Sequence, residues 1–473
     1  MLFKKLNRKL LFFALLIASS LAQAQSGKQP NFIIIFTDDL GYGDLSCYGH
    51  PTIHTPNLDQ MAAEGMRFTQ FYVGANVCTP SRAALLTGRL PVRSGVYGEK
   101  NSVFFANSPN GLPHSEVTIA QALKKRNYQT AIVGKWHLGS LPQYLPLNYG
   151  FDYYFGIPYS GDMGKVGPTG KITGSGNPPL PLYKNEKVIE TEPDQHLLTK
   201  RYTDEVLGFI RKNKNEPFFM YYANNFPHVP LYASKDFEGK SKRGLYGDVV
   251  EELDWSVGEI LKELKKQKLD KNTFVIFTSD NGPWLWKDVL NETGGSAGLL
   301  YEAKSTTYEG GMRVPAIAWW PGTIKPNQIS YSVATTMDLY PTILHLAKAE
   351  VPHDRPIDGN DITDLLTGKK EKVTDIVYYY HMGRLQAVRK GPWKAHFSTL
   401  STYSRKPLEE HNPPLLYNIE ADPSEQYDVA KKNPEIVEEL KKVYEEHKKN
   451  MVMAPPLLDD VMQKNSVGAT TSN

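Results

Sequence analysis

The chain has 473 residues, too many for one small core, and its length favours a large domain followed by a smaller one. Its 54 Lys and Arg residues nearly balance 51 Asp and Glu residues, so we expect no nucleic-acid partner. Any affinity for an anion must therefore come from a local site.

Residues 1–24 are typical of a cleaved signal peptide and are not expected to belong to the fold. A basic start precedes the apolar run Leu10–Leu21 and the small-residue cleavage site Ala22-Gln23-Ala24. The run is short for a bilayer span, and no later segment is apolar enough to be one. We therefore expect an exported protein, periplasmic or secreted, with no membrane association after cleavage.

Four apolar runs predict strands that are buried on both faces of a parallel sheet, at residues 31–37, 130–134, 217–223 and 273–279. Each run is followed by polar residues, in turn Asp38 and Asp39, Lys135 and His137, His228, and Asp280 and Asn281. Ligands of open α/β sheets bind at the carboxyl ends of the strands. We therefore expect these four polar clusters to meet at one edge of the sheet.

Helices are predicted over residues 58–66, 117–127, 200–213 and 248–268, and further strands over 68–73 and 315–320. The Gly-, Pro- and Tyr-rich segment 150–193 is expected to be a long loop over the site, with a small hairpin.

The pattern changes after about residue 365. Short strands at 376–380, 385–389, 393–397 and 415–417, followed by a helix over 434–450, predict a small antiparallel sheet with one helix. The predicted domains are residues 25–365 and 366–473.

The chain has two cysteines, Cys47 and Cys78, and they allow two interpretations. In an oxidising compartment they could form a disulfide. Alternatively, Cys78 is modified and Cys47 remains a free thiol.

Residues 77–89 predict a short helix with chemistry at its start. Thr79 can cap the helix, Pro80 suits the first turn and Gly88 suits the end. Cys78 would then lie at a helix N-terminus, where backbone N–H groups favour an anion, with Arg82 one turn further on the same face.

The run Cys78-Thr79-Pro80-Ser81-Arg82, followed by Leu86-Thr87-Gly88-Arg89, resembles the signature of the type I sulfatases without a departure. The resemblance implies that a formylglycine-generating enzyme converts Cys78 to formylglycine during maturation. It also implies an α/β fold like that of alkaline phosphatase, with a large mixed sheet flanked by helices and a small C-terminal domain.

Three further runs, Gly41–Leu45, Lys304–Pro315 and Lys394–Phe397, are similar to those of arylsulfatase A and the N-acetylgalactosamine-6-sulfatases. This chain departs from the animal enzymes in having few cysteines, which affects stabilisation rather than the site.

Asp38, Asp39, Asp280 and Asn281 offer the oxygen ligands that calcium and magnesium prefer. One such pair alone would more often be a turn or a helix cap, but here two pairs follow buried strands. The resemblance implies one calcium ion, held by these four positions and the modified Cys78.

The resemblance also implies catalytic or sulfate-binding roles for Arg82, Lys135, His137, His228 and Lys304, and it places Ser160 near the sulfate. In the expected mechanism one hydroxyl of the hydrated formylglycine attacks sulfur while Asp280 takes its proton, and His137 deprotonates the second hydroxyl. His228 and Lys304 protonate or neutralise the leaving oxygen. Arg82 and Lys135 hold the negative oxygens of the sulfate group.

We therefore expect a sulfuric ester hydrolase that acts on a terminal 6-sulfated galactose or N-acetylgalactosamine, with His381, Arg384 and His396 as further contacts to the sugar. Two alternatives stay open: a formylglycine-dependent phosphodiesterase or phosphonate monoester hydrolase, and a non-catalytic, calcium-containing glycan-binding protein.

Overall fold

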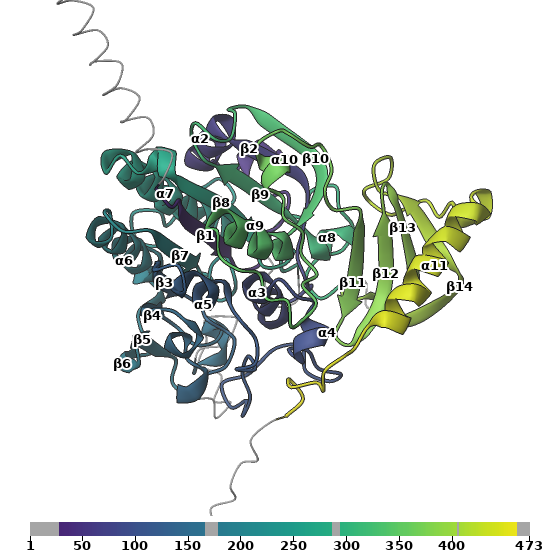
Figure 1. Ribbon diagram of the computed structural model, residues 1–473, viewed down its shortest axis with the longest axis horizontal. Helices are drawn as coiled ribbons and strands as arrows, with labels where there is room; N and C mark the ends of the chain where they lie inside the picture. Colours follow the sequence, from purple (N-terminus) through teal and green to yellow (C-terminus); the bar gives the residue numbers. More distant parts are fainter. Residues whose placement is uncertain (1–27, 166–177, 286–293, 404–405, 461–473) are drawn as a thin grey trace, which may run out of the picture.

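The computed structural model describes residues 28–165, 178–285, 294–403 and 406–460, and two β-sheets organise this part of the chain (Figure 1). The larger is a mixed sheet of ten strands in the order β10-β2-β9-β8-β1-β7-β3-β4-β5-β6, and the smaller is the antiparallel sheet β11-β12-β13-β14. The predicted fold class is thereby confirmed, with helices flanking the large sheet and one helix on the small one.

The strands of the large sheet are β1 (Asn31–Thr37), β2 (Met66–Tyr72), β3 (Gln129–Gly134), β4 (Tyr153–Gly156), β5 (Pro181–Lys184), β6 (Lys187–Thr191), β7 (Phe218–Ala223), β8 (Thr273–Ser279), β9 (Arg313–Trp319) and β10 (Gln328–Thr335). The helices around it are α2 (Pro56–Glu64), α3 (Cys78–Thr87), α4 (Pro91–Ser94), α5 (Ile119–Lys124), α6 (Leu198–Lys212), α7 (Leu245–Lys266), α8 (Glu309–Met312), α9 (Leu339–Leu346) and α10 (Thr363–Leu366). The C-terminal part contains β11 (Ile376–His381), β12 (Arg384–Lys390), β13 (Trp393–Ser401), β14 (Lys406–Asn418) and α11 (Pro434–Asn450).

The centre of the large sheet consists of the four predicted buried strands, side by side and parallel in the order β8-β1-β7-β3. Side chains at alternate positions of β1 enter two different cores. Phe32, Ile34 and Phe36 pack on the side of α3, α5 and α9, whereas Ile33 and Ile35 pack on the side of α2, α6 and α7. Because both faces are covered, these strands are apolar throughout.

The edge strand β10 and helix α9 were not predicted, and neither were the short elements β4, α4, α8 and α10. β10 lies at the edge of the sheet, and Tyr331 in it is 71% exposed. Because one face of this strand contacts solvent, it lacks the continuous apolar run that identified the central strands. The predicted hairpin within 150–193 is formed by β5 and β6, while β4 extends the sheet parallel to β3. Residues 166–177 of that segment lie outside the described residues.

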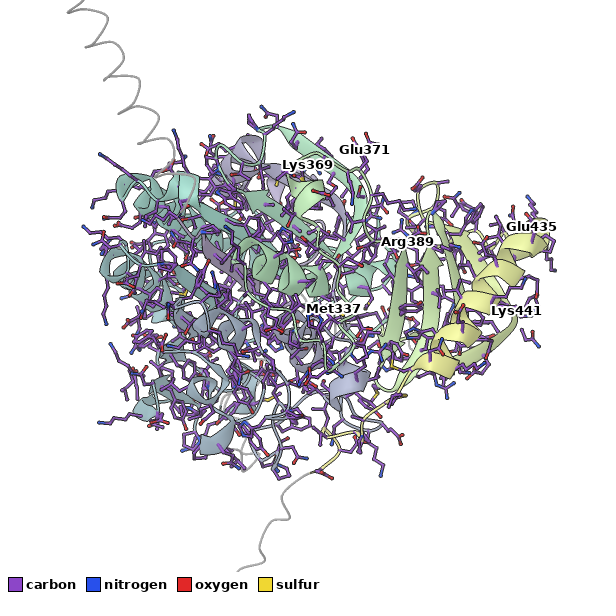
Figure 2. The ribbon with its side chains drawn as sticks, in the orientation of Figure 1. Met337, Lys369, Glu371, Arg389, Glu435 and Lys441 are labelled. Carbon is purple, nitrogen blue, oxygen red and sulfur yellow. The ribbon has the colours of Figure 1, made fainter. Side chains whose placement is uncertain are left out.

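The small sheet carries α11 on one face, where Val437 and Leu440 pack with Ala395 and Leu416. Figure 2 shows Glu435 and Lys441 on this helix, away from the large sheet, and Arg389 between the two sheets. Arg389 is buried and reaches the side chains of Tyr72 and Gln70 in β2. The small sheet is thus joined to the large one by buried polar contacts.

Within the described residues no helix is both long and apolar enough to cross a membrane. The predicted signal peptide, residues 1–24, lies outside the described residues, and the division of the chain at residues 365 and 366 stays a prediction.

Candidate active site

The four predicted polar clusters meet at one edge of the large sheet, next to the first turn of α3. Asp38 and Asp39 follow β1, Lys135 and His137 follow β3, His228 follows β7, and Asp280 and Asn281 follow β8. These four strands are parallel neighbours, so their carboxyl ends lie together.

Helix α3 begins at Cys78, two residues earlier than a cap at Thr79 would allow, so the predicted capping role of Thr79 is wrong. The carbonyl of Val77 accepts the first helical hydrogen bond from Ser81 N, and no side chain caps the helix. Thr79 instead donates its hydroxyl to the carbonyl of His137 at 3.0 Å. The end of the helix is as predicted: Gly88 has φ 69° and donates to the carbonyl of Ala84.

Cys78 lies almost fully buried at the start of this helix, with 2% of its surface exposed. Burial raises the pKa of its thiol to about 11, against the attraction of Lys135 and Lys304. An unmodified Cys78 would therefore stay protonated at neutral pH and be a poor nucleophile. Cys47 and Cys78 are both free, so the disulfide interpretation is wrong.

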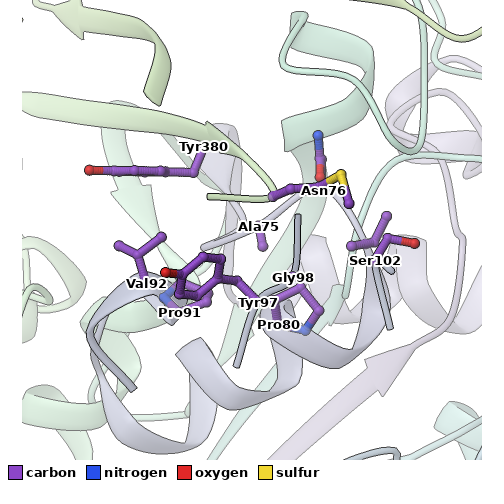
Figure 3. Close-up of a pocket in the computed structure, with 11 residues that line it drawn as sticks. Ala75, Asn76, Pro80, Pro91, Val92, Tyr97, Gly98, Ser102 and Tyr380 are labelled. Carbon is purple, nitrogen blue, oxygen red and sulfur yellow. The ribbon is translucent and has the colours of Figure 1, made fainter. Parts of the chain in front are cut away.

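A small cavity of about 10 Å³ lies beside the start of α3, lined by Asn76, Pro80, Tyr97 and Tyr380 among others (Figure 3). This volume is about that of one water molecule. The cavity is too small to hold a sugar, and Cys78 is not among its lining residues.

Three carboxylates and one amide gather beside Cys78, and Asp38, Asp39, Asp280 and Asn281 are each at most 1% exposed. Ligand atoms of Asp38, Cys78 and Asp280 lie within 4.8 Å of one another. Asp280 Oδ1 accepts a hydrogen bond from the backbone N of Asp39 at 3.1 Å, and Asn281 Nδ2 donates to Asp39 Oδ1 at 2.7 Å. These bonds tie the end of β1 to the end of β8.

Each of the three carboxylates pairs with one buried cation: Asp38 Oδ2 with Lys135 Nζ at 2.5 Å, Asp39 Oδ1 with Lys304 Nζ at 2.7 Å, and Asp280 Oδ2 with Arg82 Nη2 at 2.7 Å. Burial opposes ionisation of Asp38, but Lys135 holds the pKa of that carboxyl well below its usual range. Burial, together with repulsion from Asp38, raises the pKa of Asp280 to about 7. With all three carboxylates ionised, their charges balance those of the three cations, so a bound divalent cation would make the pocket attractive to an anion.

The donor set fits a hard divalent cation. Asp38 Oδ1 and Asn281 Oδ1 are buried, and neither has a hydrogen-bond partner among the described residues. Unpartnered buried oxygens are costly unless an unseen water or ion satisfies them. The three carboxylates are crowded, and the raised pKa of Asp280 shows that a further positive charge would be favourable there. Oxygen ligands of this kind suit calcium or magnesium.

His137 lies at the start of α3. The prediction that Lys135 and His137 alternate on an extended segment is wrong. β3 ends at Gly134, and His137 has φ 58°. Its Nε2 lies 2.9 Å from the carbonyl of Phe104, which can only accept, so Nε2 carries the proton. Burial and the nearby Lys135 hold the pKa of His137 well below its usual range. The ring is therefore neutral, with an unpartnered lone pair on buried Nδ1.

His228 has the opposite arrangement. Its Nδ1 lies 2.6 Å from the carbonyl of Val229, so Nδ1 carries the proton, and Nε2 faces Asp39 Oδ2 at 3.6 Å. Ser160 is buried, with its Oγ 3.4 Å from His228 Nδ1, which brings this predicted substrate-binding residue to the same site.

Three participants were not predicted. The hydroxyl of Tyr221 lies 3.4 Å from Arg82 Nη1, the ring of Trp284 lies 5.2 Å below Lys304 Nζ, and the carbonyl of Phe104 fixes the tautomer of His137. Tyr221 is hidden in an apolar run, and a backbone carbonyl leaves no sequence signal.

Of the three predicted contacts to the sugar, the one from His396 is wrong. It is fully buried, with Nε2 2.6 Å from Glu425 Oε1, and it cannot reach a ligand. His381 is bonded to Asn76, two residues before Cys78, and Arg384 is exposed and paired with Glu410.

Comparison with known proteins gives consistent matches over most of the chain. The family model described as sulfatase matches residues 30–349, and the one for the C-terminal region of aryl-sulfatase matches residues 372–472. The chain is 41% identical to arylsulfatase A of Homo sapiens over 462 residues, covering 91% of this chain and 89% of that protein. It is 40% identical to N-acetylgalactosamine-6-sulfatase of Mus musculus over 485 residues, covering 94% and 91%. The solved structure of PsFucS1 sulfatase from Pseudoalteromonas sp. matches with a TM-score of 0.81 and 28% identity, covering 92% of this chain and 94% of that one.

Proposed function

The chain belongs to the sulfatase family of sulfate-ester hydrolases, and we propose that it releases sulfate from a saccharide using formylglycine at position 78 and a bound calcium ion. The observation that supports this most is the buried ring of paired charges around Cys78. Asp38, Asp39 and Asp280 provide the carboxylates, and Lys135, Lys304 and Arg82 provide the cations.

Asp38, Asp39, Asp280 and Asn281, with residue 78, would hold the calcium ion, which supplies positive charge to a sulfate oxygen. The hydrated aldehyde of formylglycine supplies two hydroxyls on one carbon, one for attack at sulfur and one for the release of sulfate. An unmodified thiol whose pKa is raised to about 11 by burial offers neither.

The side chains of this chain move the protons. Asp280 accepts the proton of the attacking hydroxyl, and His137 Nδ1, a lone pair on a neutral ring, accepts the proton of the other. On the leaving side, His228 Nε2 and Lys304 Nζ face Asp39 from two directions. The Lys304 ammonium can donate a proton to the departing sugar oxygen, and His228 can do so from Nε2 when its ring is protonated on both nitrogens. Arg82 and Lys135 are fully buried and orient the sulfate oxygens without solvent screening.

The proposed substrate is a terminal 6-sulfated galactose or N-acetylgalactosamine. The similarity to an N-acetylgalactosamine-6-sulfatase over most of both chains supports it. A primary 6-sulfate projects from the ring and can reach a buried site at the strand ends, whereas a sulfate on a ring carbon is more hindered. Export to the periplasm or the medium, as the first 24 residues indicate, would suit degradation of external glycans.

The test uses protein produced together with a formylglycine-generating enzyme. Sulfate release is measured from 6-sulfated and 4-sulfated galactosides, from intact polymer, and from a matched pair of aryl sulfate and aryl phosphate. We expect fast release from the terminal 6-sulfated unit. Equal rates on the two positional isomers, or fast release from internal units, would rule out this substrate. Faster hydrolysis of the phosphate would favour the phosphodiesterase alternative.

A further inference from the structure

The segment Glu302–Glu309, which carries Lys304, is held in place by the C-terminal sheet. Thr307 donates its hydroxyl to Gln386 Oε1 at 2.8 Å, and the hydroxyl of Ser401 donates to Glu302. Glu302 and Ser305, which lie on either side of Lys304, have φ values of 57° and 69°. Non-glycine residues in this region persist where the surroundings hold them, so the conformation around Lys304 depends on outside contacts.

Lys394 of β13 makes the most central of these contacts. Its ammonium is fully buried and lies 2.9 Å from the carbonyl of Thr307, 3.0 Å from Glu309 Oε1 and 2.9 Å from Glu425 Oε1. These three acceptors match the three N–H groups of a lysine. The ring of Tyr379 lies 4.1 Å from the same nitrogen. Lys394 thus joins the Lys304 segment to the small sheet with no donor left over.

Glu309, at the end of the segment, is fixed in the same way. Its backbone N donates to Glu425 Oε2 at 2.6 Å, and its carboxylate accepts the hydroxyls of Tyr72 at 2.6 Å and Tyr379 at 3.1 Å. Burial opposes ionisation of Glu309, but Lys394 lowers its pKa to about 2, so the pair is charged at every physiological pH.

We propose that Lys394 is a positioning residue for Lys304: by holding the Thr307 carbonyl and Glu309, the C-terminal sheet sets where the Lys304 ammonium meets the leaving oxygen. This inference rests on the proposed function, in which Lys304 acts at that oxygen. It gives the C-terminal sheet a part in the chemistry, through a residue that touches neither substrate nor cation.

A displaced Lys304 affects substrates unequally. A sugar alkoxide is a poor leaving group and depends on neutralisation of the departing oxygen, whereas a nitrophenolate leaves with little help. A displacement of about 1 Å in a catalytic group can cost about a hundredfold in rate. Lys394→Gln should therefore lower kcat on the galactoside 6-sulfate about 10- to 100-fold more than kcat on 4-nitrophenyl sulfate, with a smaller change in KM.

The experiment measures both rates for the formylglycine-containing wild type, for Lys394→Gln, for Lys304→Ala and for the double variant. Because the proposed effect acts through Lys304, the extra loss on the sugar sulfate should disappear in the Lys304→Ala background. Arg93→Gln is the matched control. It removes a part-buried pair with Asp358, Nε to Oδ2 at 2.9 Å, away from the segment, and should leave the ratio of the two rates unchanged.

Thr307→Val provides a second, milder variant in case Lys394→Gln does not fold. It removes the bond to Gln386 without stranding a charge and should shift the same ratio in the same direction by a smaller factor. Equal losses on both substrates, or a ratio change that persists without Lys304, would overturn the inference while leaving the proposed function intact. Wild-type enzyme that hydrolyses neither sulfate ester would instead overturn the proposed function, and the inference with it.

Discussion

Arg82→Met tests the charge arrangement of the site through stability. The Arg82 side chain is fully buried, pairs with Asp280 at 2.7 Å, and has Asp38 at 3.6 Å. It also donates to the carbonyl of Lys135 at 3.1 Å, so it connects the ends of β1, β3 and β8. Methionine has no donor, and it also loses the contact of the guanidinium with the Phe36 ring, whose centroid lies 5.5 Å from Arg82 Cζ.

Removing one partner of a buried ion pair costs about 3–5 kcal/mol, because the remaining charge is left uncompensated. Here two buried carboxylates lose their shared cation, so we expect Arg82→Met to lie within that range. Arg82→Lys keeps the charge but lacks the planar fork that reaches both Asp280 and the Lys135 carbonyl. One lost buried hydrogen bond costs about 1–3 kcal/mol, which is the loss expected for Arg82→Lys.

The assay is denaturant unfolding of the wild type and both variants, with excess calcium and again after chelation. We expect the wild type to have the highest unfolding free energy, Arg82→Lys a lower one and Arg82→Met the lowest. An unfolding free energy of Arg82→Met within about 1 kcal/mol of the wild type, as is common for surface substitutions, would contradict a stabilising role of the Arg82 ion pair.

Three further predictions concern the cation, acid stability and the backbone. Asp39→Ala should lower bound calcium, measured by elemental analysis, together with sulfate-ester activity; unchanged metal content would contradict the assignment. Glu309→Gln should flatten acid unfolding: the pKa of Glu309 falls from 4.5 to about 2, so its stabilisation is complete above the first value and lost as pH falls to the second. Melting curves of that variant should show a lower Tm at pH 7 and a smaller change across this window than in wild type. Gly134→Ala should prevent folding, because Gly134 has φ 114° and an added Cβ would lie 1.9 Å from the Ala223 carbonyl oxygen; soluble protein with a native-like melt would exclude this.

That the polar clusters after the four central strands lie close together could be predicted, because the carboxyl ends of neighbouring parallel strands meet at one edge of the sheet. Asp38, His228 and Asp280 each come directly or shortly after a run that is buried on both faces, and parallel neighbours bring such ends together. The small sheet was predicted from a different pattern, short runs separated by turns, although β13 (Trp393–Ser401) and β14 (Lys406–Asn418) are longer than the predicted strands.

Other parts depend on contacts that the sequence does not encode locally. The tautomer of His137 is set by the carbonyl of Phe104, 33 residues away, and nothing in either residue's neighbourhood indicates the pairing. His396 was expected to contact the sugar as a polar residue of the C-terminal domain, whereas its Nε2 lies 2.6 Å from Glu425 Oε1 inside the protein. Edge strand β10 was missed because four of its first five residues are exposed or half-buried, which gives a weaker signal than a continuous apolar run.

The proposed mechanism depends most on the chemical state of residue 78, and the mass of one peptide reports this state. Trypsin cleaves after Arg67 and Arg82, which releases Cys78 in a single peptide from the active enzyme. We predict that this peptide is lighter than its sequence by the difference between a CH2SH and a CHO group, and that the converted fraction rises in proportion to specific activity. Fully active protein in which Cys78 keeps its thiol would contradict this mechanism.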